Sequence, residues 1–232
     1  MPARKQPRSD SGDSFSFADV VKLTNATRSN LIHWTNIGII KPDIEDTAGP
    51  GYPRRFSRFN LGEVHLAALV NSLRVPVAVT GQAVREFRDQ HELSEAVLLA
   101  GGASDTDERA LTEREREAAL NALVDAAVRR DRVAGAEGVK PRSFYARHLR
   151  NDARFVSEAA QRNVLREARA WRQFVENPRR GPSFALFVYP KDGYAHVYVE
   201  PLIVRDSIPE IAIVVNLAEV VHFVHAVAGR PL

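Results

Sequence analysis

The chain has no cysteine among its 232 residues and no apolar run long enough to cross a membrane. Without thiols it forms no disulfide, no thiolate metal site and no thiol redox switch. Its first residues, MPARK, lack the apolar core of a signal peptide. A membrane helix needs roughly 20 consecutive apolar residues, which this sequence does not supply. We therefore expect a cytoplasmic location and no contact with a membrane.

Signatures of catalysis are absent as well. The sequence has no glycine-rich phosphate loop, no serine nucleophile elbow and no HExxH pattern. We therefore expect no enzymatic activity, no cofactor and no resident metal. One alternative stays open, because His222 and His225 are one helical turn apart and His196 lies on an expected strand. Histidines without a nearby carboxylate ligand are more often structural, which is the interpretation that we favour.

The residues that are present predict a folded, slightly basic protein. Hydrophobic residues make up 44% of the chain, which is enough for a buried core at this length. The formal net charge is +3 and the isoelectric point is about 9.4. This balance is compatible with a nucleic-acid partner but does not require one.

Residues 15–73 have the order of a short helix, a tight turn, a second helix, a loop and a third helix. Apolar residues recur at helical spacing in both short helices, so these helices are expected to share a small core. The residues concerned are Phe17, Val20, Val21 and Leu23 in the first helix, and Leu31, Ile32 and Trp34 in the second. Thr27 is a suitable N-cap, because its hydroxyl can accept a free backbone N–H. Capping by Thr27 leaves Arg28, Ser29 and Asn30 in the first turn, where helix-turn-helix proteins contact bases and phosphates.

The loop after the second helix is expected to form a wing. Gly38 can adopt the left-handed conformation that ends a helix, and Pro42 prevents the helix from resuming. Glycines and prolines between residues 41 and 56 favour a strand, a turn and a second strand. Arginines follow this turn at positions 54, 55 and 58, where guanidinium groups can bridge phosphates with two hydrogen bonds each. Ser57 then caps the third helix.

Together, residues 16–90 resemble the MerR family of winged helix-turn-helix regulators. The resemblance is carried by LTNATR (23–28), LIHW (31–34), IGIIKP (37–42) and the GY and FS pairs of the wing (51–57), and residues 75–84 are similar to the family's next helix pair. Three positions depart from the pattern. Asn25 replaces a turn glycine and tolerates a left-handed backbone. Ile32 replaces an arginine, so a phosphate contact falls to Arg28 or His33, and Pro53 lies inside the wing.

The resemblance implies a homodimer that binds a two-fold symmetric site in double-stranded DNA and regulates transcription. The residues expected to contact DNA are Thr27, Arg28, Ser29, Asn30, His33, Tyr52, Arg54, Arg55 and Arg58. A small-molecule effector is a candidate further partner. The motifs leave open a DNA-binding protein outside transcription, such as a phage packaging subunit, an excision factor or a chromosome-organising protein.

Composition divides the chain into four parts. Residues 1–14 are expected to be a flexible basic tail, and residues 15–100 the MerR-like DNA-binding domain, which ends at AGGASD (100–105). Residues 105–178 are expected to form a helical linker or dimerisation region. Residues 182–232 are expected to form an α/β module for effector binding or association.

Two helices are expected in the region 105–178. The first, over residues 107–133, is either the dimer seam or an ordinary packed helix of one subunit. The second, over residues 143–176, carries arginines at 147, 150, 154, 162, 166, 169 and 172 on its outer face. These arginines contact flanking DNA or an acidic partner helix, or they are simply solvated, as most charged helix faces are.

The C-terminal sequence changes to the alternation of β-strands. Residues 184–189 and 194–199 predict a hairpin with Asp192 and Gly193 in its turn, followed by a strand over 211–215 and a helix capped by Asn216. The aromatic residues of this part either fill the core or line an apolar ligand pocket; they are Phe184, Phe187, Tyr189, Tyr194, Tyr198 and Phe223. The expected fold class is mainly α with some β: a winged helix-turn-helix head, long central helices and a small C-terminal antiparallel sheet-plus-helix module.

Overall fold

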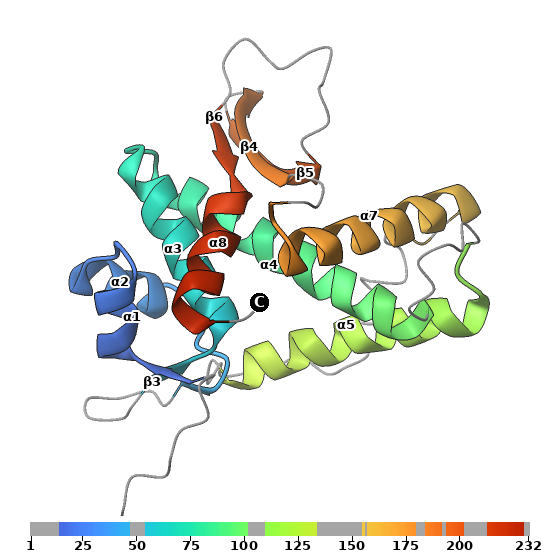
Figure 1. Ribbon diagram of the computed structural model, residues 1–232, viewed down its shortest axis with the longest axis horizontal. Helices are drawn as coiled ribbons and strands as arrows, with labels where there is room; N and C mark the ends of the chain where they lie inside the picture. Colours follow the sequence, from blue (N-terminus) through green and yellow to red (C-terminus); the bar gives the residue numbers. More distant parts are fainter. Residues whose placement is uncertain are drawn as a thin grey trace, which may run out of the picture.

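The computed structural model describes residues 14–46, 54–101, 110–133, 155, 157–179, 184–191, 194–201 and 213–229. Over these ranges the protein is mainly helical, with seven helices and two small antiparallel sheets (Figure 1). The mainly helical class with a minority of strands is thus confirmed. None of the helices in the described ranges is long and apolar enough to span a membrane. The expected basic tail lies almost wholly outside the described residues.

The two short N-terminal helices form as expected, α1 (Phe17–Leu23) and α2 (Arg28–Asn36). Helix α1 begins with a capping box, in which the Ser16 hydroxyl accepts from the Asp19 backbone N–H at 3.2 Å and the Asp19 carboxylate accepts from the Ser16 N–H at 2.9 Å. The Thr27 hydroxyl accepts from the Asn30 N–H at 3.1 Å, which confirms Thr27 as the N-cap of α2. Gly38 has a φ of +76°, so the left-handed residue that ends this unit is also confirmed.

Three very short strands form the first sheet, in the order β1–β3–β2. They are β1 (Phe15–Ser16), β2 (Glu45–Asp46) and β3 (Arg54–Phe56). The register pairs Phe15 with Phe56 and Glu45 with Arg55. The expected strand pair between residues 41 and 56 is therefore present. Its connection, residues 47–53 with the candidate DNA contact Tyr52 and the atypical Pro53, lies outside the described residues.

Helix α3 (Arg58–Ser72) begins at Ser57, whose hydroxyl accepts from the Asn60 N–H at 3.1 Å, as the sequence predicts. The next helix differs from the expectation. Where residues 75–84 are similar to the family's next helix pair, residues Val77–Gly101 form the single helix α4. No proline follows Pro76 in this stretch, and the lone interior glycine, Gly81, is tolerated within a helix, so nothing interrupts it before Gly101.

Helix α5 (Glu113–Val133) begins later than the expected residue 107, after the cap formed by Thr112, whose hydroxyl accepts from the Glu115 N–H at 3.3 Å. The expected continuous helix over 143–176 is wrong. Its described part is α7 (Glu158–Glu176), and Ser157 before it has an extended backbone with φ −124° and ψ 156°. The Ser157 hydroxyl accepts from the Ala160 N–H at 3.2 Å, so a local cap sets the beginning of the helix.

The C-terminal part contains the second sheet, in the order β5–β4–β6. The expected hairpin is confirmed as β4 (Phe184–Lys191) and β5 (Tyr194–Pro201), although its turn residues lie outside the described ranges. Strand β6 (Ile213–Asn216) leads into α8 (Leu217–Ala228). The Asn216 carbonyl oxygen of the side chain accepts from the Ala218 N–H at 2.9 Å, which confirms the predicted cap.

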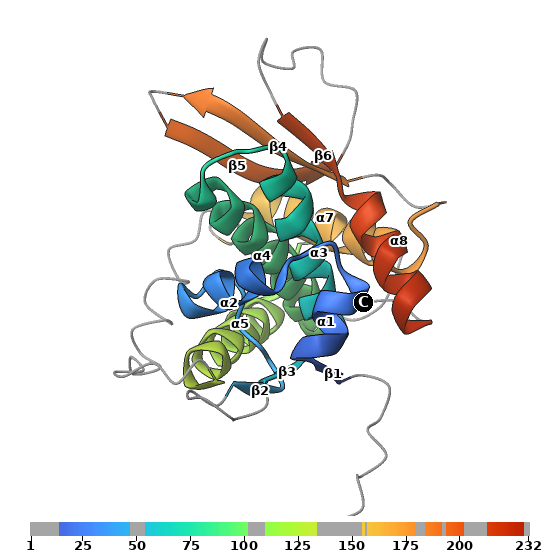
Figure 2. The same cartoon turned by 90° about the vertical axis from the view of Figure 1, so that its left-hand side faces the viewer.

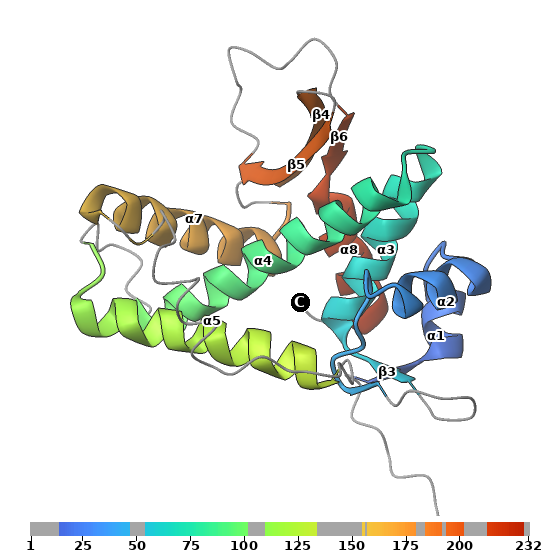
Figure 3. The same cartoon turned by 180° about the vertical axis from the view of Figure 1, so that it is seen from behind.

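The apolar cores cross the boundaries that composition suggests. Helix α8 packs against α3, and one cluster joins Leu66 of α3, Phe87 of α4, Trp171 of α7, Phe184 of β4 and Val220 of α8. Figures 2 and 3 show α8 beside α3 and the second sheet above the helices. A separate cluster joins α4, α5 and α7. The C-terminal sheet and helix are therefore built onto the N-terminal part through a shared core.

Candidate nucleic-acid interface

Helix α2 presents the beginning of its first turn to solvent. Arg28 and Ser29 are exposed, and Asn30 is half-buried, whereas Leu31 and Trp34 are buried beneath them. Because the buried pair fixes the rotation of the helix, the exposed residues occupy a constant face. The N-terminus of a helix also carries partial positive charge and free backbone N–H groups, which favour an anionic partner.

Arg28 is oriented by the neighbouring helix. Its guanidinium carbon lies 5.9 Å from the centre of the Phe17 ring, within the range of a cation–π contact. Phe17 itself packs against the ring of Phe56 with centroids 6.4 Å apart. The arginine at the tip of α2 is thus supported by α1 and, through Phe17, by β3.

One residue assigned to the core from the sequence is on this surface instead. Ile32 is 39% exposed and takes no part in the clusters of buried residues. In a helix, successive residues are rotated by about 100°, so Ile32 points away from the side that buries Leu31 and Trp34. The exposed His33 follows it. Ile32 therefore adds an apolar contact surface next to the polar first turn.

The three candidate arginines of the wing occupy different settings. Arg54 donates to the hydroxyl of Thr35 and, at 3.4 Å, to the side-chain oxygen of Asn36, so it fastens β3 to the C-terminal end of α2. Arg55 and Arg58 are half-buried, on β3 and in the first turn of α3. Hydrogen bonds from Ser16 lower the pKa of Asp19, and the positive charge of Arg55 adds to this shift. Arg54 is thus in part a structural residue, because several of its donors serve the protein itself.

The base of the wing is held by Asn60, a residue that sequence analysis passed over. Its buried side chain donates to the carbonyl of Lys41 at 3.0 Å and to the carboxylate of Glu63 at 2.7 Å. Its side-chain oxygen accepts from the N–H of Asp43 at 3.0 Å and of Ser57 at 3.3 Å. The Asp43 carboxylate in turn accepts from the Ser57 hydroxyl at 2.6 Å. One asparagine therefore ties the loop after α2 to the beginning of α3.

A buried ion pair lies behind this network. Glu63 is fully buried, and one oxygen of its carboxylate lies 2.5 Å from Nε of Arg88, which is 8% exposed on α4. Burial raises the pKa of Glu63, and the charge of Arg88 opposes this effect. A buried pair of this kind is costly to break, because either partner alone is a desolvated charge. It links α3 to α4 beneath the wing.

Charge alone does not define this surface. Residues 14–60 contain six lysines and arginines against four aspartates and glutamates. Because this excess of positive charge is modest, the arrangement of Arg28, Ser29 and the wing is the feature that favours a nucleic acid.

On α7, the expected outer arginines are exposed at 162 and 166 and half-buried at 169 and 172, while 147, 150 and 154 lie outside the described residues.

The three histidines considered as candidate metal ligands lie in different settings. Nε2 of His225 lies 2.8 Å from the carbonyl oxygen of Val175, which joins α8 to α7. His222 is half-buried on α8, and the side chain of His196 lies outside the description. In the ranges that the structure describes, no three His, Asp or Glu side chains gather as metal ligands would.

The aromatic residues of the C-terminal part are divided between core and surface. Phe184 is buried against Trp171 at 5.0 Å and Phe174 at 5.2 Å between ring centres, so it fills the core. Phe223 is half-buried and stacks on His65 at 4.0 Å. The side chains of the other four candidates, Phe187, Tyr189, Tyr194 and Tyr198, are outside the description.

Comparison of the chain with family models, with curated proteins and with solved structures found no match.

Proposed function

We propose that the protein is a sequence-specific DNA-binding regulator of transcription with a MerR-like winged helix-turn-helix head, acting as a homodimer on a two-fold symmetric site. The observation that carries the proposal is the exposed first turn of α2. It presents Arg28 and Ser29 beside a strand pair that Arg54 fastens to the same helix. This combination suits a helix that enters the major groove and a wing that contacts the adjacent backbone.

Within this proposal the candidate residues have distinct roles. Arg28, supported by the Phe17 ring, reaches a base edge, and Thr27, Ser29 and Asn30 contact the nearby phosphate or bases. Arg55 and Arg58 contact phosphates, with Tyr52 at the wing and His33 on the outer side of α2. Arg54 combines a phosphate contact with its structural bonds. Two copies would place two such helices on successive half-sites.

The test is selection of a bound sequence from random duplexes, followed by fluorescence anisotropy with the selected duplex and a scrambled one. Arg28→Ala is expected to reduce the preference for the selected duplex by about 1–3 kcal/mol, the value of a bidentate base contact. Arg85→Ala, a change of an exposed arginine on α4, serves as the control of equal charge. A wild-type chain that selects no sequence would overturn the proposal, and unchanged preference in Arg28→Ala would remove Arg28 from the base contacts.

Genomic mapping then separates regulation from the other DNA functions. Binding sites at promoters, with two-fold symmetric sequences, are expected. Sites confined to packaging, excision or chromosome-organising elements would instead favour the non-transcriptional alternative. Sedimentation of the complex with the selected duplex is expected to give two chains per site.

A further inference from the structure

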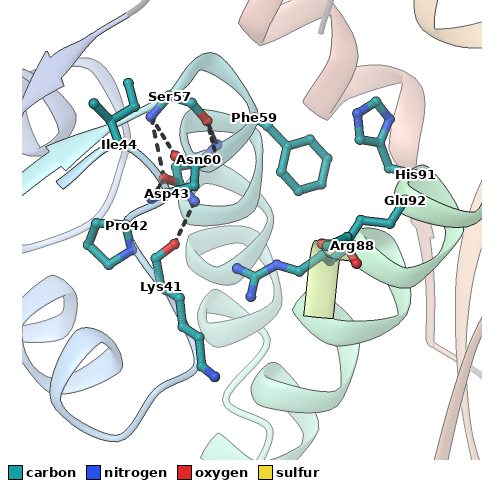
Figure 4. Close-up of a pocket in the computed structure, with 11 residues that line it drawn as sticks. Lys41, Pro42, Asp43, Ile44, Ser57, Phe59, Asn60, Arg88, His91 and Glu92 are labelled. Carbon is teal, nitrogen blue, oxygen red and sulfur yellow. Dashed lines mark hydrogen bonds between the residues drawn. The ribbon is translucent and has the colours of Figure 1, made fainter. Parts of the chain in front are cut away.

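A cavity of about 430 Å³ opens beneath the wing (Figure 4). One wall is the loop after α2, from Lys41 to Ile44, and the others are the first turn of α3, the middle of α4 and Ala126 of α5. Cavities that hold small molecules begin at about 300 Å³. The space is therefore large enough for an organic ligand.

A buried donor belongs to Arg88, one of the residues that line this cavity. Figure 4 shows the Arg88 side chain extending from α4 toward the loop that holds Lys41. Nε of Arg88 is paired with Glu63, but its buried Nη2 has no hydrogen-bond partner among the described residues. A buried polar group without a partner costs about 1–3 kcal/mol, so an acceptor supplied from the cavity would be stabilising.

The charged groups around the cavity are of both signs. Lys41 and Arg88 are cationic, Asp43 and Glu92 are anionic, and the Glu63 carboxylate lies behind Arg88. A phosphate or carboxylate would add an anion to a site that already contains three carboxyl groups, and the charge of Arg88 is already matched by Glu63. A cation would meet Arg88 itself. This mixture of charges therefore favours a neutral ligand with an acceptor atom.

Two aromatic rings, those of Phe59 on α3 and His91 on α4, also line the cavity. The rings of Phe59 and His91 stack with centres 4.5 Å apart and planes 15° apart. Nδ1 of His91 accepts a hydrogen bond from the indole N–H of Trp171 at 3.3 Å, which gives His91 a fixed acceptor role on this side. Burial lowers the pKa of His91 to about 4, so the ring is neutral near pH 7. A planar ligand can pack against these two rings.

We propose that this cavity binds a small, neutral, planar molecule whose carbonyl or ring nitrogen accepts a hydrogen bond from Nη2 of Arg88. Binding of this molecule does not depend on the proposed function. The bound molecule would also change the affinity for DNA, through the loop that leads from the cavity wall into β2, and this second effect rests on the proposed function.

The test is a titration of the full chain, without DNA, with four matched probes: benzamide, benzoate, benzylamine and toluene. The readout is the ¹H–¹⁵N signal of the Trp171 indole, whose N–H is bonded to His91 of the cavity wall. Trp34, buried in the N-terminal cluster, is the internal reference. Benzamide is expected to shift the Trp171 signal and leave that of Trp34 in place. The other three probes are expected to bind about tenfold more weakly, because each lacks the acceptor or carries a charge.

Two variants test the site itself. Arg88→Lys keeps a positive charge opposite Glu63 but removes Nη2, and Ala126→Leu fills the cavity from α5 without touching the ion pair. Both are expected to lower the affinity for benzamide by about tenfold. Ala118→Leu, at an exposed position of the same helix, is the matched control and is expected to bind as the wild type does.

Three results would overturn the proposal. These are the absence of binding by benzamide at millimolar concentrations, stronger binding of benzoate or benzylamine than of benzamide, and unchanged affinity in Ala126→Leu. Should Arg88→Lys fail to fold, Ala126→Leu still decides whether the cavity is the site. Since no DNA is present, loss of probe binding is distinguishable from failure of the DNA-binding proposal.

Discussion

At the scale of single residues, Asn60 makes more side-chain hydrogen bonds than capping the beginning of a helix requires. A capping asparagine needs only to satisfy a backbone N–H of the first turn. Asn60 uses both ends of its amide, so the loop carbonyl of Lys41, the N–H of Asp43 and the buried Glu63 all depend on it. Its replacement would remove a hydrogen bond from each of these groups, among which the Glu63 carboxylate is fully buried.

We therefore predict that Asn60→Ala lowers the free energy of unfolding by about 2–3 kcal/mol, the cost of losing hydrogen bonds to buried polar groups. Urea unfolding monitored by circular dichroism measures this change. Asn163→Ala, at an exposed position of α7, is the control and is expected to remain within about 0.5 kcal/mol of the wild type. Equal stabilities of the two variants would show that the network around Asn60 contributes little.

His91 gives the protein an acid-sensitive point. Burial lowers its pKa from the ordinary 6.5 to about 4, so between these values the unfolded chain binds more protons than the folded one. Stability is then complete above the unfolded pKa and is lost as the pH falls toward the folded pKa. We predict a loss of about 1–2 kcal/mol in the free energy of unfolding between pH 7 and pH 5 from this residue.

His91→Gln isolates this contribution, because glutamine keeps an acceptor for the Trp171 indole but does not titrate. Urea unfolding at a series of pH values is expected to give a shallower slope for the variant in this window. His65, whose pKa burial also lowers, is present in both proteins and cancels in the comparison. Identical slopes would exclude His91 as the source.

The residues that the sequence predicted correctly are those whose role is local. Thr27, Ser57 and Asn216 cap helices through bonds to residues two or three positions away, and Gly38 needs only its own left-handed backbone. Ile32 was misplaced because the sequence suggests which residues are apolar but not how the helix is rotated. Arg54 and Asn60 bond to residues up to 19 positions away, so their partners depend on the tertiary fold.

At the scale of elements, the strand β3 owes its position to side chains more than to its ladder. Its pairing with β1 and β2 covers only two residues on each side, whereas Arg54 bonds to two residues of α2. Strands this short are marginal without such support. The contact therefore determines where the wing lies relative to α2.

We predict that Arg54→Ala loosens this attachment and speeds amide hydrogen exchange in β3 by about tenfold, the equivalent of one hydrogen bond to a charged group. Amides of α7 are expected to be unaffected. Arg85→Ala, at an exposed position of α4, is the control for the loss of a positive charge. Unchanged exchange in Arg54→Ala would show that the ladder alone holds β3.

Helix boundaries show the same division between local and distant causes. The prediction of one helix from residue 143 is wrong because apolar residues continue at helical spacing on both sides of Ser157, whereas Ser157 caps α7 and so sets its beginning.

The candidate dimer face of α5 packs inside the chain. Leu111, just before the helix, and Ala119 and Leu123 on it are buried in a cluster with residues of α4 and α7 of the same chain, which fits the packed-helix alternative.

At the scale of the whole molecule, the two tryptophans lie in two different clusters that α3 and α8 connect. Trp34 belongs to the N-terminal cluster, which also contains Val224 of α8, and Trp171 belongs to the cluster with the second sheet. Composition suggested separate modules because it reports local character. Helices α3 and α8 are about 150 residues apart in the sequence. Their pairing depends on the shape and burial of their faces, which are properties of the folded chain.

This shared core leads to the last prediction. The signals of the Trp34 and Trp171 indoles are expected to disappear at the same urea concentration, because α8 covers α3 and neither cluster is complete alone. Val224→Ala removes two methyl groups from the N-terminal cluster and is expected to lower stability by about 2 kcal/mol. Since the clusters unfold together, it should move both transitions equally. Val77→Ala, at an exposed position of α4, should move neither. A shift of the Trp34 transition alone would mean that the C-terminal part folds as an independent unit.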